Sequence, residues 1–113
     1  MTDEVNWIDF QIVSNKSKYK HSEPIRISGK LQTGMVANVY FYIFYKNSSG
    51  NWIEPPNTHS IPSVATSNEA HTDNRTFDTS IQLNQFYPLG NYKLVAKYAE
   101  ISCPIEPQFD LIT

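Results

Sequence analysis

The longest stretch of the chain without a turn residue is Val36 to Lys46, VANVYFYIFYK, and the rest of the fold must be arranged around it. Val, Ile, Phe and Tyr dominate it, and their branched or aromatic side chains suit a pleated, half-buried backbone. Its length fits one long strand and is short for a helix. The stretch therefore predicts a central strand of an antiparallel sheet, which needs neighbouring strands and a second layer to be stable.

Successive side chains of a strand point to opposite faces of its sheet, so this stretch carries two sets of side chains. We assign one set to the core: Val39, Phe41, Ile43 and Tyr45. The alternate set then points outward: Tyr40, Tyr42 and Phe44. Because both sets are apolar or aromatic, the reversed register, in which the two sets exchange places, stays open.

Six further segments have the alternation or composition of strands. The main strands are expected at 7–14, 25–32, 36–46, 51–53, 75–83, 91–99 and 108–113. Residues 54–74 are expected to form a long loop with one short edge strand near 60–66. No segment predicts a helix longer than about two turns. Strands with turn signals at intervals of roughly 8–12 residues indicate a sandwich or small barrel, here as one domain over residues 1–113.

Four local expectations follow from alternation and from turn residues. In the first strand, Ile8, Phe10 and Ile12 are expected to point inward. In the second, Gly29 falls on the inward side, which indicates a bulge or a close approach of the facing sheet. Residues 15–24 are expected to be a loop that carries the ring of Tyr19, and residues 100–107 a bent loop.

Composition restricts the class of protein. The 113 residues are 40% hydrophobic and 18% charged, which fits a folded domain and neither a disordered chain nor a membrane protein. The net charge of −2 argues against a general nucleic-acid binder. The first ten residues lack the basic and apolar regions of a signal peptide, and a single cysteine, Cys103, excludes an intrachain disulfide. We therefore expect a soluble protein, with the cytoplasm favoured.

Three stretches together resemble the immunoglobulin-like superfamily in its fibronectin type III and bacterial Ig-like branches. They are YKHSEPIRISG at 19–29, the aromatic strand that begins at Val36, and Leu83 followed by LGNYKLVA at 89–96. The resemblance implies an all-β, Ig-like antiparallel β-sandwich of about seven strands. It also implies a tyrosine corner at Tyr92, whose hydroxyl would bond to upstream backbone. The chain lacks the paired cysteines of antibody domains and a Trp in its third strand.

The inventory of reactive side chains includes His21, His59, His71, Asp73 and Cys103. No nucleophile elbow, glycine-rich phosphate loop or recognised metal-ligand spacing accompanies them. We expect solvated loop histidines and a half-buried thiol rather than catalysis. The sequence therefore predicts a protein that is not an enzyme and that has no metal and no cofactor. An enzyme or inhibitor acting through the long loop is the least favoured alternative.

One candidate site is a face of the sheet. In Ig-like topology the strand at 36–46 lies beside the strand at 91–99, so the outward rings would alternate with outward side chains of the second strand. The expected interface consists of Tyr40, Tyr42, Phe44, Lys93, Val95 and Lys97. Tyr beside Lys is typical of contact surfaces, so a protein partner or a second copy of the chain is the first hypothesis.

Two alternatives compete with a protein contact on this face. A small carbohydrate-binding, lectin-like module would use Trp52, Tyr40 and Tyr42 as platforms on which sugar rings stack. In the other alternative the lysine stems simply lie over the rings and cover an ordinary outer face. Neither nucleic acid nor membrane insertion is expected.

Overall fold

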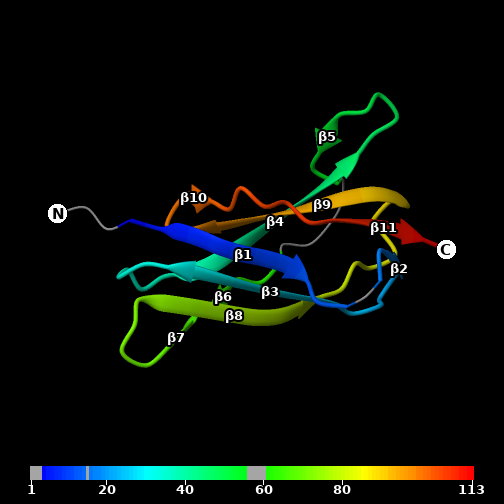
Figure 1. Ribbon diagram of the computed structural model, residues 1–113. Helices are drawn as coiled ribbons and strands as arrows, with labels where there is room; N and C mark the ends of the chain where they lie inside the picture. Colours follow the sequence, from blue (N-terminus) through cyan, green and yellow to red (C-terminus); the bar gives the residue numbers. More distant parts are fainter. Residues whose placement is uncertain (1–3, 15, 56–60) are drawn as a thin grey trace.

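The computed structural model describes residues 4–14, 16–55 and 61–113. Within them the protein is all-β, and two sheets pack face to face in a sandwich (Figure 1). This confirms the predicted fold class. His59 and the first residue of the edge strand expected at 60–66 lie outside the described residues. The part of the chain that is described holds no helix long and apolar enough to cross a membrane.

The first sheet has the strand order β1-β3-β8-β7. Its strands are β1 (Asn6–Ile12), β3 (Ile25–Gln32), β8 (Asn74–Ile81) and β7 (Ser67–Asn68). The second sheet has the order β2-β11-β9-β4-β5, with β10 paired to β9 and β6 paired to β4. Its strands are β2 (Lys18–Lys20), β11 (Gln108–Ile112), β9 (Gly90–Tyr98), β4 (Asn38–Lys46), β5 (Trp52–Ile53), β10 (Ile101–Ser102) and β6 (Val64–Ala65). The β2–β11 pair is parallel, and the other described pairs are antiparallel.

The core lies between the two sheets and is built from the inward sets that alternation predicts. These side chains are buried: Ile25, Ile27, Leu31, Val39, Phe41, Ile43, Phe77, Ile81, Tyr92, Leu94, Ala96, Tyr98, Phe109 and Leu111. On β4 the outward residues Tyr40 and Tyr42 are 52% and 41% exposed. The register of β4 is therefore the one assigned to the core from the sequence, and the reversed register is wrong.

The first strand departs from simple alternation. Trp7 pairs with Leu31 and Asp9 pairs with Lys30, so the register shifts between Trp7 and Asp9 and leaves Ile8 as an extra residue. Such a bulge moves the next residues to the opposite face. Trp7 therefore packs against the core, whereas Ile8 is 50% exposed. The expectation that Ile8 points inward was wrong.

The segment expected to be a loop around Tyr19 contains strand β2. Its three residues pair in parallel with β11, and Leu111 is the partner of Tyr19. The Tyr19 ring is 1% exposed and lies edge-on to Phe109, with ring centroids 5.9 Å apart. Three residues are too short for alternation to be read from sequence, because the strand exists only where β11 offers an edge.

Two other loop expectations are confirmed only in part. Residues 100–107 contain β10, which pairs with β9, and the Cys103 that follows it is 1% exposed rather than half-buried. The backbone N–H of Cys103 donates to the carbonyl of Ala96, which holds this segment against β9. Near 60–66 the chain forms β6 on the second sheet and then β7 on the first. The short edge strand expected here is thus present as β6, and the crossing to β7 on the other sheet was not predicted.

Gly29 does mark a close approach, but its neighbour belongs to the same sheet. A Cβ at Gly29 would lie 2.3 Å from Cζ of Phe77 on β8 and 3.0 Å from the carbonyl oxygen of Asp9 on β1. The Phe77 ring occupies this space and contacts Phe10 and Phe41, with ring centroids 5.9 and 5.6 Å away. The missing side chain therefore makes room for an aromatic cluster.

Candidate contact face on the second sheet

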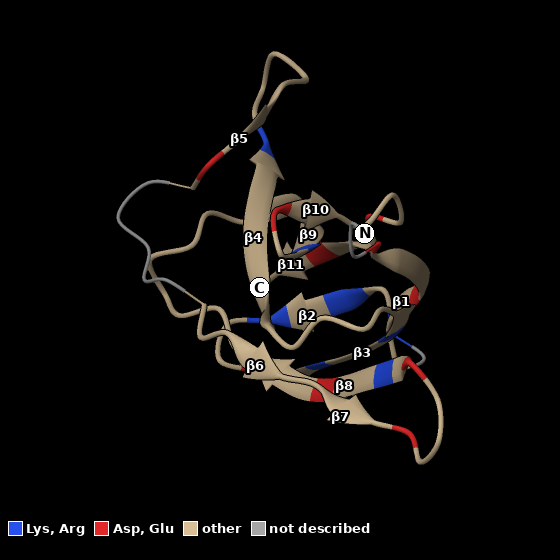
Figure 2. Cartoon of the chain, turned by 90° about the vertical axis from the view of Figure 1, so that its left-hand side faces the viewer, with Lys and Arg blue, Asp and Glu red and all other residues tan. Residues whose placement is uncertain are grey.

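The outer face of the second sheet brings together all six residues that the sequence assigned to an interface. The β4–β9 register pairs Tyr40 with Lys97, Tyr42 with Val95, and Phe44 with Lys93. We call these six residues the contact face: Tyr40, Tyr42, Phe44, Lys93, Val95 and Lys97. β4 itself carries no charge before Lys46 at its end, so its ribbon is almost wholly tan in Figure 2, the colour of uncharged residues.

The members of the contact face differ in exposure. Tyr40 and Tyr42 are exposed, whereas Phe44 is half-buried. Val95 is only 8% exposed although it does not belong to the core cluster between the sheets. It lies opposite Tyr42, and the longer side chains around it shield it from water. The buried, apolar Val95 is thus bordered by the exposed rings of Tyr40 and Tyr42.

Lysine ammonium groups lie over several of these rings. Lys97 Nζ is 5.2 Å from the centroid of Tyr42, and Lys93 Nζ is 5.8 Å from that of Phe44. At these distances an ammonium is attracted to the ring face. Lys93 Nζ is also 3.3 Å from a carboxylate oxygen of Glu106. Lysines therefore lie over Phe44 and Tyr42, as the alternative of a covered face proposed, but Tyr40 and Tyr42 are still exposed to solvent.

Trp52 extends the Phe44 end of the face from strand β5. Its half-buried ring has Lys93 Nζ at 5.0 Å and Lys46 Nζ at 5.8 Å from the centroid. A sugar ring that stacked on Trp52 would compete with these two cations for the π face. Three aromatic residues were proposed to stack on a sugar. Of these, Trp52 lies apart from the two exposed tyrosines, and its ring already contacts two lysines.

The Tyr40 end of the face borders a hollow of about 380 Å³. Its lining consists of Ala37, Asn38, Tyr40, Tyr42, Lys97, Ala99 and Glu100. The sequence did not predict this hollow, because Ala99 and Glu100 were expected at a strand end and in a loop. No residue type in that stretch signals a hairpin.

The hollow is closed on one side by the turn between β9 and β10. Tyr98 pairs with Ile101, so Ala99 and Glu100 form a two-residue hairpin loop. Both have positive φ, 48° and 69°, a conformation that such loops normally fill with Asn and Gly. For Ala and Glu the left-handed conformation costs roughly 1 kcal/mol per residue. The fold therefore holds Glu100 at the rim of the hollow against a local conformational penalty.

A buried tyrosine fixes the opposite wall. The Tyr98 hydroxyl donates to the carbonyl of Met35 and accepts from the N–H of Ala37, at 2.7 and 2.8 Å. These bonds attach the segment before β4 to β9. The hairpin itself is held by Trp7, whose indole N–H donates to the carbonyl of Ile101 at 3.1 Å. The geometry of the hollow thus depends on Tyr98 and Trp7, which do not line it.

Tyr92 lies under the face rather than on it. Its hydroxyl donates to the carbonyl of Pro88, four residues upstream, as the Ig-like resemblance implied. The ring stacks on Phe109 with centroids 5.6 Å apart and is completely buried. Burial, together with the neighbouring Tyr45 and Tyr87, raises the pKa of the Tyr92 phenol well above its usual value. Its hydroxyl therefore serves as a structural donor.

The other reactive side chains lie in separate segments. His21 follows β2, and its Nε2 lies 2.8 Å from the carbonyl of Tyr87. His71 and Asp73 lie in the turn between β7 and β8. Burial raises the pKa of the Cys103 thiol above its usual value. Among residues 4–14, 16–55 and 61–113, no group of three His, Cys, Asp or Glu side chains could hold a metal ion.

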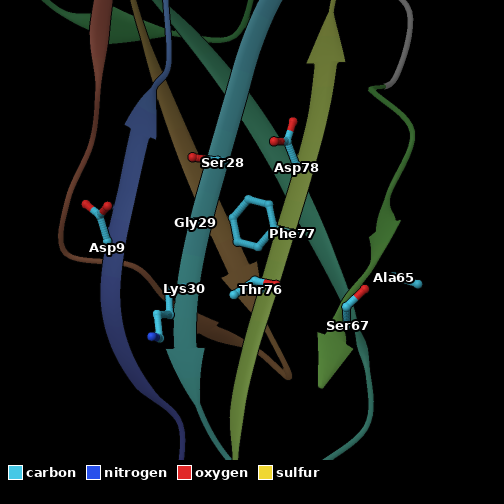
Figure 3. A pocket seen from close by; sticks show the side chains of 9 residues that line it. All are labelled: Asp9, Ser28, Gly29, Lys30, Ala65, Ser67, Thr76, Phe77 and Asp78. Carbon is cyan, nitrogen blue, oxygen red and sulfur yellow. The ribbon is translucent and has the colours of Figure 1, made fainter. Parts of the chain in front are cut away.

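A second hollow, of about 430 Å³, lies on the first sheet (Figure 3). Its lining consists of Asp9, Ser28, Gly29, Lys30, Ala65, Ser67, Thr76, Phe77 and Asp78. Two of its charges are already neutralised. Asp78 is 2.7 Å from Arg26, which holds the pKa of that carboxyl below its usual range, and Lys30 is 3.2 Å from Glu69. This hollow is polar, and two of its three charged side chains, Asp78 and Lys30, are paired within the chain.

Comparisons with known proteins give a fold and no family. No family model matches the chain, and no curated protein matches its sequence. All of the chain aligns with 32% of the alkylpurine DNA glycosylase AlkC of Pseudomonas fluorescens, solved with DNA containing an abasic site analogue, at a TM-score of 0.63 and 11% identity. A Niemann-Pick type C2 protein from the Japanese carpenter ant aligns over 95% of this chain and 90% of its own, at a TM-score of 0.51 and 11% identity. The chain thus corresponds to about a third of the glycosylase, and at such identities these likenesses establish the β-sandwich fold alone.

Proposed function

We propose that the protein is a non-enzymatic interaction module that binds a protein partner through the contact face. The observation that carries this proposal is the exposure of Tyr40 and Tyr42 side by side on an otherwise apolar strand. Rings in such a strip are the kind of surface that a partner covers. The two hydroxyls keep the strip compatible with water when the partner is absent.

The energetics of this face favour a contact with a few strong residues. Tyrosine at the centre of an interface contributes about 2 kcal/mol or more when it is desolvated. Tyr40 and Tyr42 have enough exposed area to lose on binding, whereas Phe44 and Val95 have little. We therefore expect the two tyrosines to supply most of the affinity. Lys97 would set orientation and salt dependence.

A glycan is the second candidate ligand, supported by the hollow at the Tyr40 end. Tyrosine rings next to Asn38 and Glu100 could stack on a sugar and accept or donate hydrogen bonds to its hydroxyls. A glycan array probed with the wild-type protein and with Tyr40→Ala tests this candidate. Binding by the wild type that is lost in the variant would favour a lectin-like module over a protein contact.

Within β-sandwich proteins, we infer an affiliation with the fibronectin type III and bacterial Ig-like branch. The bond from Tyr92 to Pro88 supports this, because a tyrosine corner is a hallmark of Ig-like sandwiches. The adjacency of β4 and β9 supports it as well.

A photo-crosslinking experiment tests the proposed contact. A benzophenone amino acid replaces Tyr42 in one variant and Gln11, an exposed residue of β1 on the first sheet, in a matched control. Both are expressed in the cells that make the protein and are irradiated. We expect a discrete adduct from position 42 and none from position 11. Adducts of equal yield from both positions, or none from position 42, would contradict the proposal.

A further inference from the structure

We propose that the partner is a second copy of this chain, and that the two copies meet face to face about a two-fold axis. In this dimer Lys97 of each copy pairs with Glu100 of the other. The inference rests on the proposed function of the contact face and specifies who binds there. It is carried by the charges around the hollow and by the area of the face.

Lys97 and Glu100 are charged side chains that form no ion pair in the described part of the chain. Four ion pairs are formed within the described residues: Lys16–Glu23, Arg26–Asp78, Lys30–Glu69 and Lys93–Glu106. Neither Lys97 nor Glu100 takes part in an ion pair there. Both nevertheless line one hollow beside the exposed tyrosines. A cation and an anion without an ion-pair partner are thus presented together at the Tyr40 end of the contact face.

This arrangement is self-complementary. In a two-fold interface the same patch meets itself, so residue i contacts residue j and residue j contacts residue i. A patch with one unpaired Lys and one unpaired Glu can form two cross-pairs with its own copy, and no charge is left over. A face that carried only Lys97 would repel a second copy.

The backbone also favours a role for Glu100 outside its own chain. Its φ of 69° lies in the left-handed region, where glycine would be free of strain. Glu100 makes no described hydrogen bond or ion pair that could compensate for that strain. A carboxylate held in this way at the rim of a hollow is placed for a partner's cation.

The size of the face fits a weak dimer. The nine residues of β4 span about 30 Å, and β4 and β9 with one or both of the flanking strands β11 and β5 are about 15–19 Å wide. The contact face and its flanks therefore cover roughly 500 Å² per copy. A face-to-face pair would bury about 1,000 Å², which is near the lower limit for a specific interface. We therefore expect a dissociation constant in the micromolar range or above rather than an obligate dimer.

A charge-swap mixing experiment tests the cross-pairs. Lys97→Glu places two carboxylates on the face, and Glu100→Lys places two ammonium groups there. Each variant alone meets like charge in a homodimer, so self-association should weaken at least tenfold in sedimentation velocity. When the two variants are mixed, both cross-pairs become attractive, and a heterodimer should form with about the affinity of the wild type.

Controls separate this effect from a loss of folding and from general electrostatics. Circular dichroism and thermal unfolding check that each variant is folded. Should either charge reversal unfold the protein, Lys97→Gln and Glu100→Gln replace them. Each alone should weaken association, and mixing the two should restore one of the two cross-pairs and part of the affinity. Lys30→Glu and Glu69→Lys alter an ion pair within the chain on the first sheet, so they should leave association unchanged alone and mixed.

Two results would overturn the inference. A wild-type protein that stays monomeric up to about 1 mM would exclude a second copy as the partner, while a crosslink from position 42 to another protein would leave the contact face standing. A wild type that dimerises while the mixed variants do not would show that Lys97 and Glu100 are not paired across the interface.

Discussion

The Tyr92 hydroxyl is a single group that ties the turn at 85–90 to the second sheet, because it donates to the carbonyl of Pro88. Tyr92→Phe keeps the ring and removes this donor, which leaves the carbonyl without that partner. We expect the free energy of unfolding to fall by about 1–3 kcal/mol in chemical denaturation. A variant as stable as the wild type would show that the bond contributes nothing to the corner.

Glu100 allows strain and charge to be separated at one position. Glu100→Gly relieves the left-handed conformation and should stabilise the domain by roughly 1 kcal/mol, while it removes the carboxylate and weakens self-association. Glu100→Gln is the matched control, since it keeps the strain and loses only the charge. It should weaken association with little change in stability. Loss of stability in the glycine variant would mean that the turn is not strained.

Cys103 gives a pH dependence whose sign follows from its burial. Because burial raises the pKa of the thiol, the folded protein retains a proton that the unfolded chain releases above pH 9 or so. Its contribution to stability is therefore complete below that pH and is lost as the pH rises through the folded-state pKa. Unfolding free energies between pH 8 and 10.5 should fall less steeply in Cys103→Ala than in the wild type. Parallel slopes would contradict this role for the thiol.

At the scale of elements, the packing of β3 against β8 depends on the absence of a side chain at Gly29. A Cβ there would overlap the Phe77 ring, so Gly29→Ala should destabilise the domain by about 1–3 kcal/mol. Phe77→Leu shortens the opposing side chain, and the double variant should cost less than the sum of the two single changes in denaturation. Additive losses would show that the two sites are independent.

The same scale shows which elements could be predicted from sequence. β3, β4, β8, β9 and β11 are long enough for alternation to identify their inward side chains, and those assignments are confirmed. β2 and β10 have three and two residues, and each forms only because a longer strand presents an edge to it. The bulge at Ile8 and the Ala99–Glu100 turn also follow from tertiary contacts. No local preference of these residue types favours either feature.

The contact face was predictable in part for the same reason. Tyr40, Tyr42 and Phe44 follow from the alternation of β4, and the side chains of β9 join them through the strand adjacency that the Ig-like resemblance implies. The hollow and Glu100 could not be predicted, because both depend on the hairpin between β9 and β10. The lysines were expected beside the rings, whereas their positions over Tyr42, Phe44 and Trp52 required coordinates.

For the whole molecule, the sandwich has two outer faces of different character. The first sheet presents polar side chains around a hollow in which Asp78 and Lys30 are paired with neighbours. The second presents exposed tyrosines together with a cation, Lys97, and an anion, Glu100, that form no described ion pair. Because the side chains on both outer faces point away from the core, changes there should have little effect on folding, and only changes on the second face should alter association.

Sedimentation velocity on Tyr42→Glu, over a concentration range in which the wild type associates, tests the contact face most directly. The Tyr42 side chain points away from the core and is 41% exposed, so the variant should fold with an unchanged circular dichroism spectrum. Its new carboxylate would be buried in the middle of the interface, and we expect a monomer at every concentration. The control Gln11→Glu, on the other sheet, should associate like the wild type. A folded Tyr42→Glu variant that associates as strongly as the wild type would contradict the assignment of this face.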